Sequence, residues 1–264
     1  MTPGPPAKPA TFKDHFTAQA AAYAQFRPEY PPALFDFVAS LVERRDVAWD
    51  CGTGSGQAAV ALAGHFARVV GTDASEAQVA AARGRRPHAR VEYRVVPAEA
   101  SGLPDASVNL VTVAQALHWF DLPRFYAEVR RVVAPGGALA VWSYDDPMLD
   151  DPALDERLQR FNEETVGPYW PPERRLVGEG YRALPFPFAE TAAPALTLEQ
   201  RWTLGELAGY LRSWSATARY VAARGADPVA PLEVELAALW GDPARRRLVR
   251  WPLTVRAGHV DAAG

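Results

Sequence analysis

The sequence predicts an α/β fold built on a doubly wound, mostly parallel sheet. From Val47 onward, short runs of β-branched and aromatic residues alternate with longer segments of helical periodicity, which is the pattern of successive βα units. A glycine-rich turn follows the first run and opens a helix, and acidic residues follow the next two runs. These features place candidate ligand-binding groups along one edge of the sheet.

The core of this fold is expected over residues 33–145. Its five predicted strands are at 47–50, 68–72, 91–96, 108–114 and 138–143. Its predicted connecting helices, which show alanine-rich or amphipathic spacing, are at 57–66, 75–83 and 122–133. The sequence Pro135-Gly136-Gly137 predicts a turn immediately before the fifth strand.

The segment before the core predicts a helical cover. Two helical patterns are separated at Arg27-Pro28 and resume after Pro31-Pro32, because proline is tolerated in a first helical turn. Residues 1–11 contain four prolines and little to bury, so we expect a disordered arm there. Residues 12–264 are then expected to form a single domain.

The segment after the core has a different composition. Residues 146–200 are rich in proline and aromatic residues, which predicts an insertion or lid rather than another βα unit. Residues 201–258 are expected to hold a late helix over 203–220 and edge strands. The stretch 248–257 alternates apolar and polar residues, so we expect an antiparallel strand at the sheet edge, where Pro252 would be tolerated.

The composition excludes several classes of protein. A chain of 264 residues with 48% hydrophobic and 22% charged residues matches a globular domain rather than a coiled coil or a disordered chain. The formal net charge of −3 gives no general attraction to phosphate backbones or anionic lipid, so neither nucleic acid nor a membrane is expected as a partner. The single cysteine excludes an internal disulfide, and no apolar run approaches the roughly 18 residues of a membrane helix, so we expect a cytoplasmic protein.

The most informative motif is the sequence DCGTGSGQ at residues 50–57, where a strand runs into a glycine turn that opens a helix. Gly52, Gly54 and Gly56 permit a tight turn and a close approach of the backbone to a ligand. The N–H groups at the start of the helix favour an anionic group such as a carboxylate. The loop is therefore a candidate binding site.

The register of this motif weighs against three other functions. Gln57 stands where the dinucleotide fingerprint G-x-G-x-x-G requires its third glycine, which disfavours a pyrophosphate ligand. The loop lacks the lysine of a phosphate-binding NTPase loop. Ser55 lacks the flanking glycines of a hydrolase nucleophile elbow.

Two acidic residues extend the candidate site. Asp73 follows the second predicted strand and lies 23 residues after Asp50, close to the roughly 20 residues expected for an acid that binds ribose hydroxyls. Ala98-Glu99 follows the third predicted strand. Either feature alone has a plainer interpretation, since Asp73 could simply cap the next helix. Their order along one sheet edge favours a ligand site.

These motifs resemble the class I S-adenosylmethionine-dependent methyltransferases. The resemblance rests on WDCGTGSGQ, VVGTDAS, VVPAEASGLPDASVNLVTVAQALHWFD and VVAPGGALAVW, in that order. The segments FTAQAAAYAQFRPEYP, AQALHWFD and GYLRSWSATARY are similar to the type 11 branch that includes trans-aconitate methyltransferase-like proteins. The resemblance implies a Rossmann-like, seven-stranded sheet, S-adenosyl-L-methionine as cofactor, S-adenosyl-L-homocysteine as product, and a small-molecule acceptor, for which a carboxylic acid is a candidate.

The resemblance also implies roles for individual residues. The three glycines of the loop would hold the methionine part of the cofactor, and Asp50 would orient the loop and meet the amino group. Asp73 would bind both ribose hydroxyls. Three further groups would complete the cofactor site: Ala98 and Glu99 beside the adenine, Gln115 facing the sulfonium region, and Tyr23 and Arg27 on the N-terminal segment that folds over the cofactor.

The chemistry of methyl transfer requires few catalytic groups. The sulfonium is already activated, so the protein mainly aligns the acceptor, and a base is needed only where the acceptor carries a proton. His118 is the candidate catalytic residue, as a proton acceptor or a ligand of the methyl acceptor; the alternative is a hydrogen-bonded histidine beside the cofactor. Trp214 and Ser215 could line the acceptor side.

Other functions remain open from the sequence. A non-catalytic S-adenosylmethionine-binding protein is one alternative, and an NAD-dependent oxidoreductase, which Gln57 disfavours, is another. The five histidines are scattered and only one cysteine is present, so no metal site is predicted. The sequence indicates no particular oligomeric state.

Overall fold

The computed structural model describes residues 28–260 of the chain. The expected disordered arm and the first part of the expected helical cover, with Tyr23 and Arg27, lie outside the described residues. The cover resumes with helix α2 (Pro32–Ser40), which has proline in its first turn and buries Leu34 and Phe35. No helix within residues 28–260 combines the length and apolar character needed to cross a membrane.

The parallel half of the sheet contains all five predicted strands, within a few residues of their expected bounds. They are β1 (Val47–Cys51), β2 (Arg68–Asp73), β3 (Val91–Val95), β4 (Val108–Ala114) and β5 (Val133–Tyr144). Their order is β3-β2-β1-β4-β5, and each neighbouring pair is parallel. The chain therefore reverses its direction of winding between β1 and β4, which is where such sheets bind ligands.

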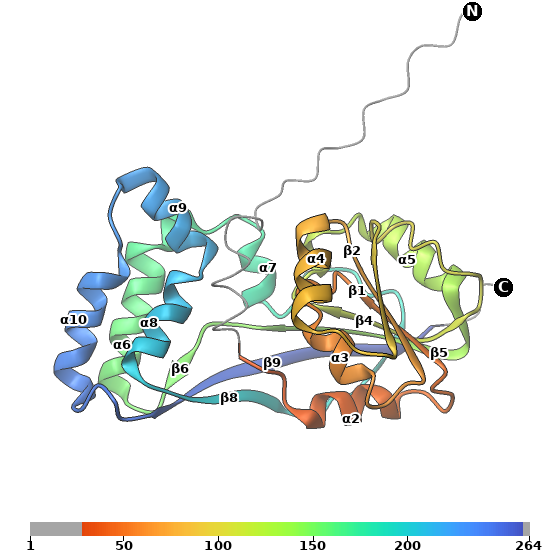
Figure 1. The fold of residues 1–264 in the computed structure, drawn as a ribbon, viewed down its shortest axis with the longest axis horizontal. Helices are drawn as coiled ribbons and strands as arrows, with labels where there is room; N and C mark the ends of the chain where they lie inside the picture. The colour runs from red at the N-terminus through yellow and green to blue at the C-terminus, as the bar shows by residue number, and fades with distance from the viewer. Residues whose placement is uncertain (1–27, 261–264) are drawn as a thin grey trace, which may run out of the picture.

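Helices cover both faces of this half-sheet (Figure 1). Three are α3 (Gln57–Leu62), α4 (Glu76–Arg85) and α5 (Leu122–Val132). Strand residues alternate between the two faces, so Leu110 packs in one apolar cluster with α2, α3 and α4, while its neighbour Val111 packs in the other with α5. The predicted doubly wound α/β fold is confirmed.

The predicted edge position of the late strand is wrong. Strand β9 (Arg247–His259) pairs antiparallel with β5, as expected for its direction, but it is not at the edge. Three further strands also pair with it: β6 (Met148–Leu149), β7 (Ala189–Thr191) and β8 (Leu196–Trp202). Pro252 costs the sheet only one backbone N–H donor. The burial of Val249 and Trp251, which are completely buried, outweighs that loss and favours an internal position for the strand.

The described sheet therefore has nine strands instead of the seven that the resemblance implied. Because β6 and β8 both pair with Val249 and Arg250, they lie on opposite edges of β9. The mixed sheet consists of a parallel half and an antiparallel extension. The strands of the extension, β6 to β9, all come from the second half of the chain.

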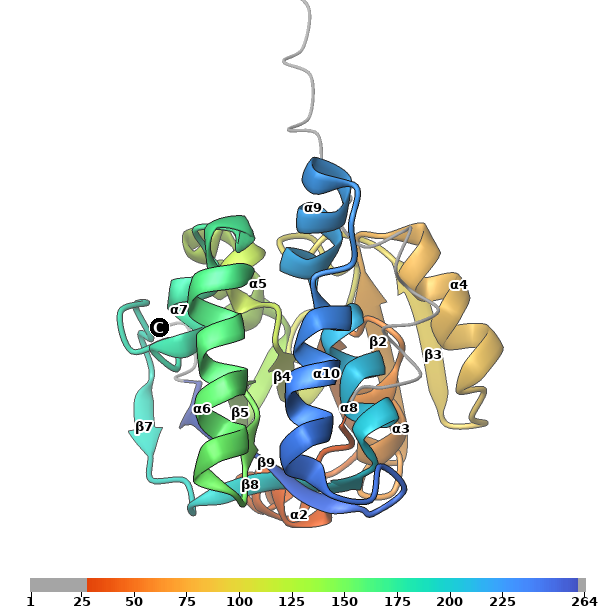
Figure 2. The same cartoon turned by 90° about the vertical axis from the view of Figure 1, so that its left-hand side faces the viewer.

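The segment expected to be a lid forms part of a helical unit. Residues 146–200 contain α6 (Pro152–Arg160), a π-helical turn (Phe161–Thr165), a 3-10 turn (Gly167–Tyr169) and α7 (Arg174–Gly178) besides the short strands. The single late helix that we expected is two helices, α8 (Leu204–Arg212) and α9 (Ser215–Arg224), followed by α10 (Val229–Trp240). Helices α6, α8 and α10 lie side by side at one end of the molecule (Figure 2).

Candidate active site

The glycine loop is attached to the end of β2 by backbone hydrogen bonds. The N–H of Thr53 donates to the carbonyl of Thr72 at 2.9 Å, and the N–H of Gly54 donates to Oδ2 of Asp73 at 3.0 Å. All three loop glycines have left-handed φ angles, of +69°, +53° and +82° in chain order. Residues with a side chain rarely adopt this backbone conformation, so these three positions favour glycine.

The three glycines differ in what surrounds them. A Cβ at Gly52 would lie 2.6 Å from Cβ of Ala116, and one at Gly56 would overlap the Tyr93 hydroxyl. A Cβ at Gly54 would meet nothing closer than Oε1 of Gln78, at 3.9 Å. Gly52 and Gly56 therefore maintain internal packing, whereas Gly54 borders open space beside Asp73.

This difference predicts distinct outcomes for two variants. We expect Gly54→Val to fold and to lose cofactor binding, because the side chain enters the open space and strains the backbone by roughly 1–3 kcal/mol. Gly56→Ala should instead lower the melting temperature, because the new Cβ would displace the Tyr93 ring, whose hydroxyl donates to the carbonyl of Arg86. Calorimetric titration and thermal unfolding measure the two effects. Equal destabilisation by both variants would contradict this division of roles.

Asp50 lies fully buried beneath the loop. Its Oδ2 accepts from the Thr53 hydroxyl at 2.6 Å, and its Oδ1 accepts from the Thr112 hydroxyl at 2.9 Å. Burial raises the pKa of Asp50 to about 6, and the two hydroxyl donors only partly oppose this rise. Asp50 thus orients the loop through Thr53; its contact with the cofactor's amino group stays a prediction.

The raised pKa predicts how stability depends on pH. Between pH 4 and 6 the folded state retains a proton on Asp50 that the unfolded state has lost, so this group's contribution to stability falls as pH rises. We expect Asp50→Asn to remove that fall. In urea unfolding without cofactor, the difference in the free energy of unfolding between wild type and variant should change by roughly 2 kcal/mol between pH 4 and 6. A constant difference would show that Asp50 titrates normally.

Asp73 joins the glycine loop to the start of α4. It ends β2 between these two elements, where Oδ2 accepts from the N–H of Gly54 and Oδ1 accepts from the N–H of Ser75 at 2.9 Å. Asp73 therefore anchors the loop. Its contact with the ribose hydroxyls stays a prediction.

The residues predicted beside the adenine have partly different roles. Ala98 is buried, and Glu99 accepts through Oε1 from the N–H of Asp121 at 2.9 Å. This bond ties the end of β3 to the start of α5, because Asp121 is the N-cap of that helix. The sequence gave no sign of this structural role. Their contact with adenine stays a prediction.

Gln115 joins the ends of β4 and β5. Its φ of +58° is unusual for a residue with a side chain, and its Nε2 donates to the carbonyl of Tyr144 at 3.0 Å. Its backbone N–H donates to the carbonyl of Trp142 at 3.0 Å. Gln115 lines a cavity, and its position beside the sulfonium region stays a prediction.

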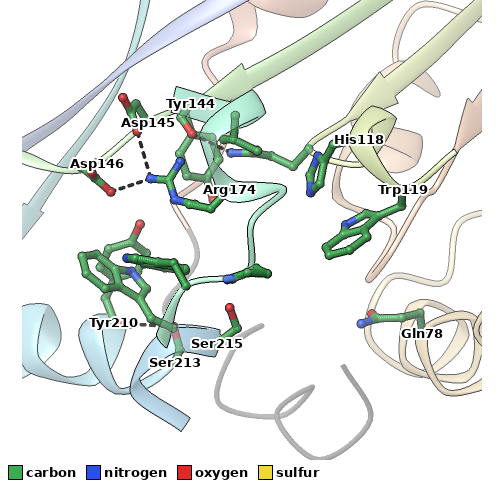
Figure 3. Close-up of a pocket in the computed structure, with 15 residues that line it drawn as sticks. Gln78, His118, Trp119, Tyr144, Asp145, Asp146, Arg174, Tyr210, Ser213 and Ser215 are labelled. Atoms are coloured by element: carbon green, nitrogen blue, oxygen red, sulfur yellow. Dashed lines mark hydrogen bonds and ion pairs between the residues drawn. The ribbon is translucent and has the colours of Figure 1, made fainter. Parts of the chain in front are cut away.

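A cavity of about 150 Å³ lies between the sheet edge and the helical unit. Figure 3 shows His118 and Trp119 on one side and Tyr210 and Ser213 on the other. The remaining lining comes mainly from the end of β5, the start of α7 and the break between α8 and α9: Gln78, Gln115, Tyr144, Asp145, Asp146, Trp170, Pro171, Arg174, Val177, Trp214 and Ser215. Both halves of the molecule therefore contribute to one site.

Arg174 is the cationic residue of this lining, and the sequence analysis missed it. Its Nη2 donates to Oδ1 of Asp145 at 2.9 Å and to Oδ1 of Asp146 at 2.6 Å. Its guanidinium also lies over the Trp170 ring, 5.1 Å from the centroid. Burial lowers the pKa of Arg174, but the two carboxylates outweigh it and leave the pKa raised. The sequence signal that could have indicated a buried cation here was the pair of acidic residues directly after the fifth strand, Asp145-Asp146.

His118 lines the cavity and is hydrogen-bonded on its other side. Its Nδ1 lies 2.9 Å from the hydroxyl oxygen of Tyr181. Burial, and secondarily the charge of Arg174, lowers the pKa of His118 to about 4. The imidazole is therefore neutral at pH 7, and Nε2 is the nitrogen left for a ligand.

Among the residues that the structure describes, no group of three or more His, Cys, Asp or Glu side chains is arranged to hold a metal ion. The sulfur of Cys51 is buried in the loop, where burial raises the pKa of the thiol well above its usual range.

Comparisons with known proteins agree with this geometry. The type 11 methyltransferase-domain family model matches residues 49–141. A protein of Dictyostelium discoideum described as a methyltransferase is 36% identical over 222 residues, which are 83% of this chain and 83% of that protein. An uncharacterized methyltransferase of Mycobacterium tuberculosis is 36% identical over 135 residues, 51% of this chain and 54% of that protein.

A solved structure from Anaeromyxobacter dehalogenans, described as a type II methyltransferase, is 46% identical with a TM-score of 0.84. The match covers 90% of this chain and 100% of that one, so it includes the helical unit as well as the sheet. The chain therefore belongs to the class I S-adenosylmethionine-dependent methyltransferases, and residues 49–141 match the type 11 methyltransferase domain.

Proposed function

We propose that the methyl acceptor is a small carboxylic acid bound in the cavity between the sheet edge and the helical unit. The observation that carries this proposal is Arg174, whose guanidinium lines the cavity. Both of its hydrogen bonds to carboxylates use Nη2, and within residues 28–260 Nε and Nη1 make none. These N–H groups can donate to an anionic oxygen.

The described residues fit the cofactor. The open space beside Gly54 admits a ligand against the backbone, and the carboxylate of Asp73 lies directly beside that loop. Gln115 and His118 follow β4 and border the cavity at the same sheet edge. S-adenosylmethionine supplies an activated methyl group when bound there. The rest of the reaction depends on how this chain aligns the acceptor.

A carboxylate acceptor suits a site without a strong base. One carboxylate oxygen would provide the electron pair of the new C–O bond, while the pair of the breaking C–S bond stays on sulfur. No proton is released, because a carboxylate is already ionised at neutral pH. Arg174 would orient the acceptor, and the aromatic walls from Trp119, Trp170 and Trp214 would exclude water.

His118 favours a second candidate, a hydroxyl or phenol acceptor that loses its proton to the imidazole. The position of His118 in the cavity lining permits this role. Its pKa of about 4 makes it a weak base, which is the reason that we rank this candidate second.

The chemical stability of the product separates the two candidates. The purified protein is incubated with S-adenosylmethionine labelled in its methyl group and a panel of mono-, di- and tricarboxylic acids that includes trans-aconitate. We expect labelled product from at least one acid, and mild alkali should release the label as volatile methanol, since it hydrolyses a methyl ester. Labelled product from phenols alone, stable to alkali, would overturn the carboxylic acid proposal. Gly54→Val is the cofactor-binding control.

A further inference from the structure

Tyr181 occupies a strained and closely held position beside the cavity. Gly180 and Tyr181 are consecutive residues with φ of +60°, and Tyr181 is only 1% exposed. The N–H of Tyr181 donates to the carbonyl of Leu176 at 2.9 Å, and Nη1 of Arg256 donates to the carbonyl of Tyr181 at 2.8 Å. A left-handed tyrosine costs of order 1–3 kcal/mol and persists only where the surroundings impose it.

The backbone on both sides of Tyr181 is fixed in the same way. A Cβ at Gly180 would lie 2.6 Å from Cγ2 of Thr254, so the turn packs directly on β9. Nη1 of Arg256 also donates to the carbonyl of Leu184 at 2.8 Å. The turn is thus held by α7 before it and by β9 beneath it. This arrangement places the hydroxyl oxygen of Tyr181 2.9 Å from Nδ1 of His118.

The hydrogen bond between Tyr181 and His118 is compatible with two tautomers, because either the phenol or an Nδ1–H can be the donor. A phenol O–H is more acidic than a neutral imidazole N–H, which favours the hydroxyl as the donor to Nδ1. In that arrangement the proton of the neutral imidazole lies on Nε2. The nitrogen that remains for the cavity is then an N–H donor.

We propose that Tyr181 is a positioning residue that holds His118 as the Nε2–H tautomer, so that His118 donates to an anionic oxygen of the methyl acceptor. This inference rests on the proposed function and narrows it. The acceptor must bring its own negative charge, because an Nε2–H imidazole cannot remove a proton. Arg174 and His118 would then be two donors to one acceptor carboxylate.

The groups around His118 are consistent with a neutral donor. Arg174 is the cation of the cavity, and Asp145 and Asp146 are both engaged with it. Burial lowers the pKa of His118, which keeps the ring uncharged through the neutral range. We therefore expect kcat/KM for the acceptor to show no titration of His118 between pH 6 and 9.

The tautomer can be measured without substrate or cofactor. Nitrogen-15 NMR of protein labelled in histidine distinguishes the Nε2–H form, the Nδ1–H form and the cation by the shifts of the two ring nitrogens. His118→Gln identifies the signal of His118 among the five histidines. We expect the Nε2–H form in the wild type at pH 7. A dominant Nδ1–H form, or the cation, would overturn the proposal.

Two phenylalanine variants test the function of this bond. Tyr181→Phe should convert His118 to a mixture of tautomers and lower kcat/KM for the carboxylic acid about tenfold, with unchanged affinity for S-adenosylmethionine. Tyr126→Phe is the matched control, since the buried Tyr126 also loses one hydrogen bond, from its hydroxyl to the carbonyl of Pro185 at 2.6 Å. Similar kinetic losses in both variants, or an unchanged tautomer in Tyr181→Phe, would refute a positioning role.

The two proposals fail in different ways. An Nε2–H tautomer with an alkali-stable product would retain the role of Tyr181 on His118 and reject the carboxylic acid. An Nδ1–H tautomer with a methyl ester product would reject the role of Tyr181 and retain the acceptor class.

Discussion

Replacing Asp73 by alanine is expected to weaken S-adenosylmethionine binding by about 100-fold or more. Two hydrogen bonds from ribose hydroxyls to a carboxylate are worth roughly 1.5–3 kcal/mol each, and even the lower value gives about 3 kcal/mol for the pair. The variant also loses the acceptor for the N–H of Gly54, so only the hydrogen bond from Thr53 to Thr72 still ties the glycine loop to the end of β2. Isothermal titration calorimetry of the folded variant measures the change.

The control for this experiment is Asp242→Ala. Asp242 accepts from the N–H of Ala244 at 2.9 Å, the same bond to a residue two positions on that Asp73 makes to Ser75. It lies in the turn between α10 and β9, outside the cofactor site. We expect its loss to leave cofactor affinity unchanged. An affinity of Asp73→Ala within threefold of the wild type, with melting intact, would remove Asp73 from the cofactor site.

The parallel half of the fold and its glycine loop could be predicted because they depend on local sequence. A strand that is buried on both faces shows a continuous apolar run, and each helix shows its own period, so neither requires knowledge of distant contacts. The same holds for Gly54 and Asp73, which sit where a strand ends. The register of β1 on β2, with Asp50 opposite Gly71, brings the two strand ends together.

The acceptor side could not be predicted in this way. Arg174 meets Asp145 and Asp146 across 29 and 28 residues, and Tyr181 meets His118 across 63. These pairs join segments that are far apart in the sequence, and no local pattern encodes which distant segments meet. For the same reason the strand that contains Pro252 was expected at the sheet edge, although it is internal.

Replacing Arg174 by alanine is expected to raise KM for the carboxylic acid acceptor about 100-fold while changing the affinity for S-adenosylmethionine by less than about threefold. The guanidinium comes from α7, and the lining of its cavity includes neither the glycine loop nor Asp73, so cofactor affinity should scarcely change. Steady-state kinetics with the best acid from the panel, together with cofactor titration, separates the two effects.

The same variant should also lose stability, because Asp145 and Asp146 then face each other without the cation that Arg174 supplies. A second variant prevents this instability from obscuring the result. In Arg174→Gln combined with Asp146→Asn, the trio loses one positive and one negative charge, so its net charge stays at −1 and no carboxylate pair is left unscreened. We expect the double variant to melt near the wild-type temperature and yet to show the same rise in KM, because a neutral amide cannot replace the charged, two-bond contact of the guanidinium with a carboxylate. If the double variant recovers both stability and KM, Arg174 only supports the fold, and the carboxylate of the acceptor must be bound elsewhere.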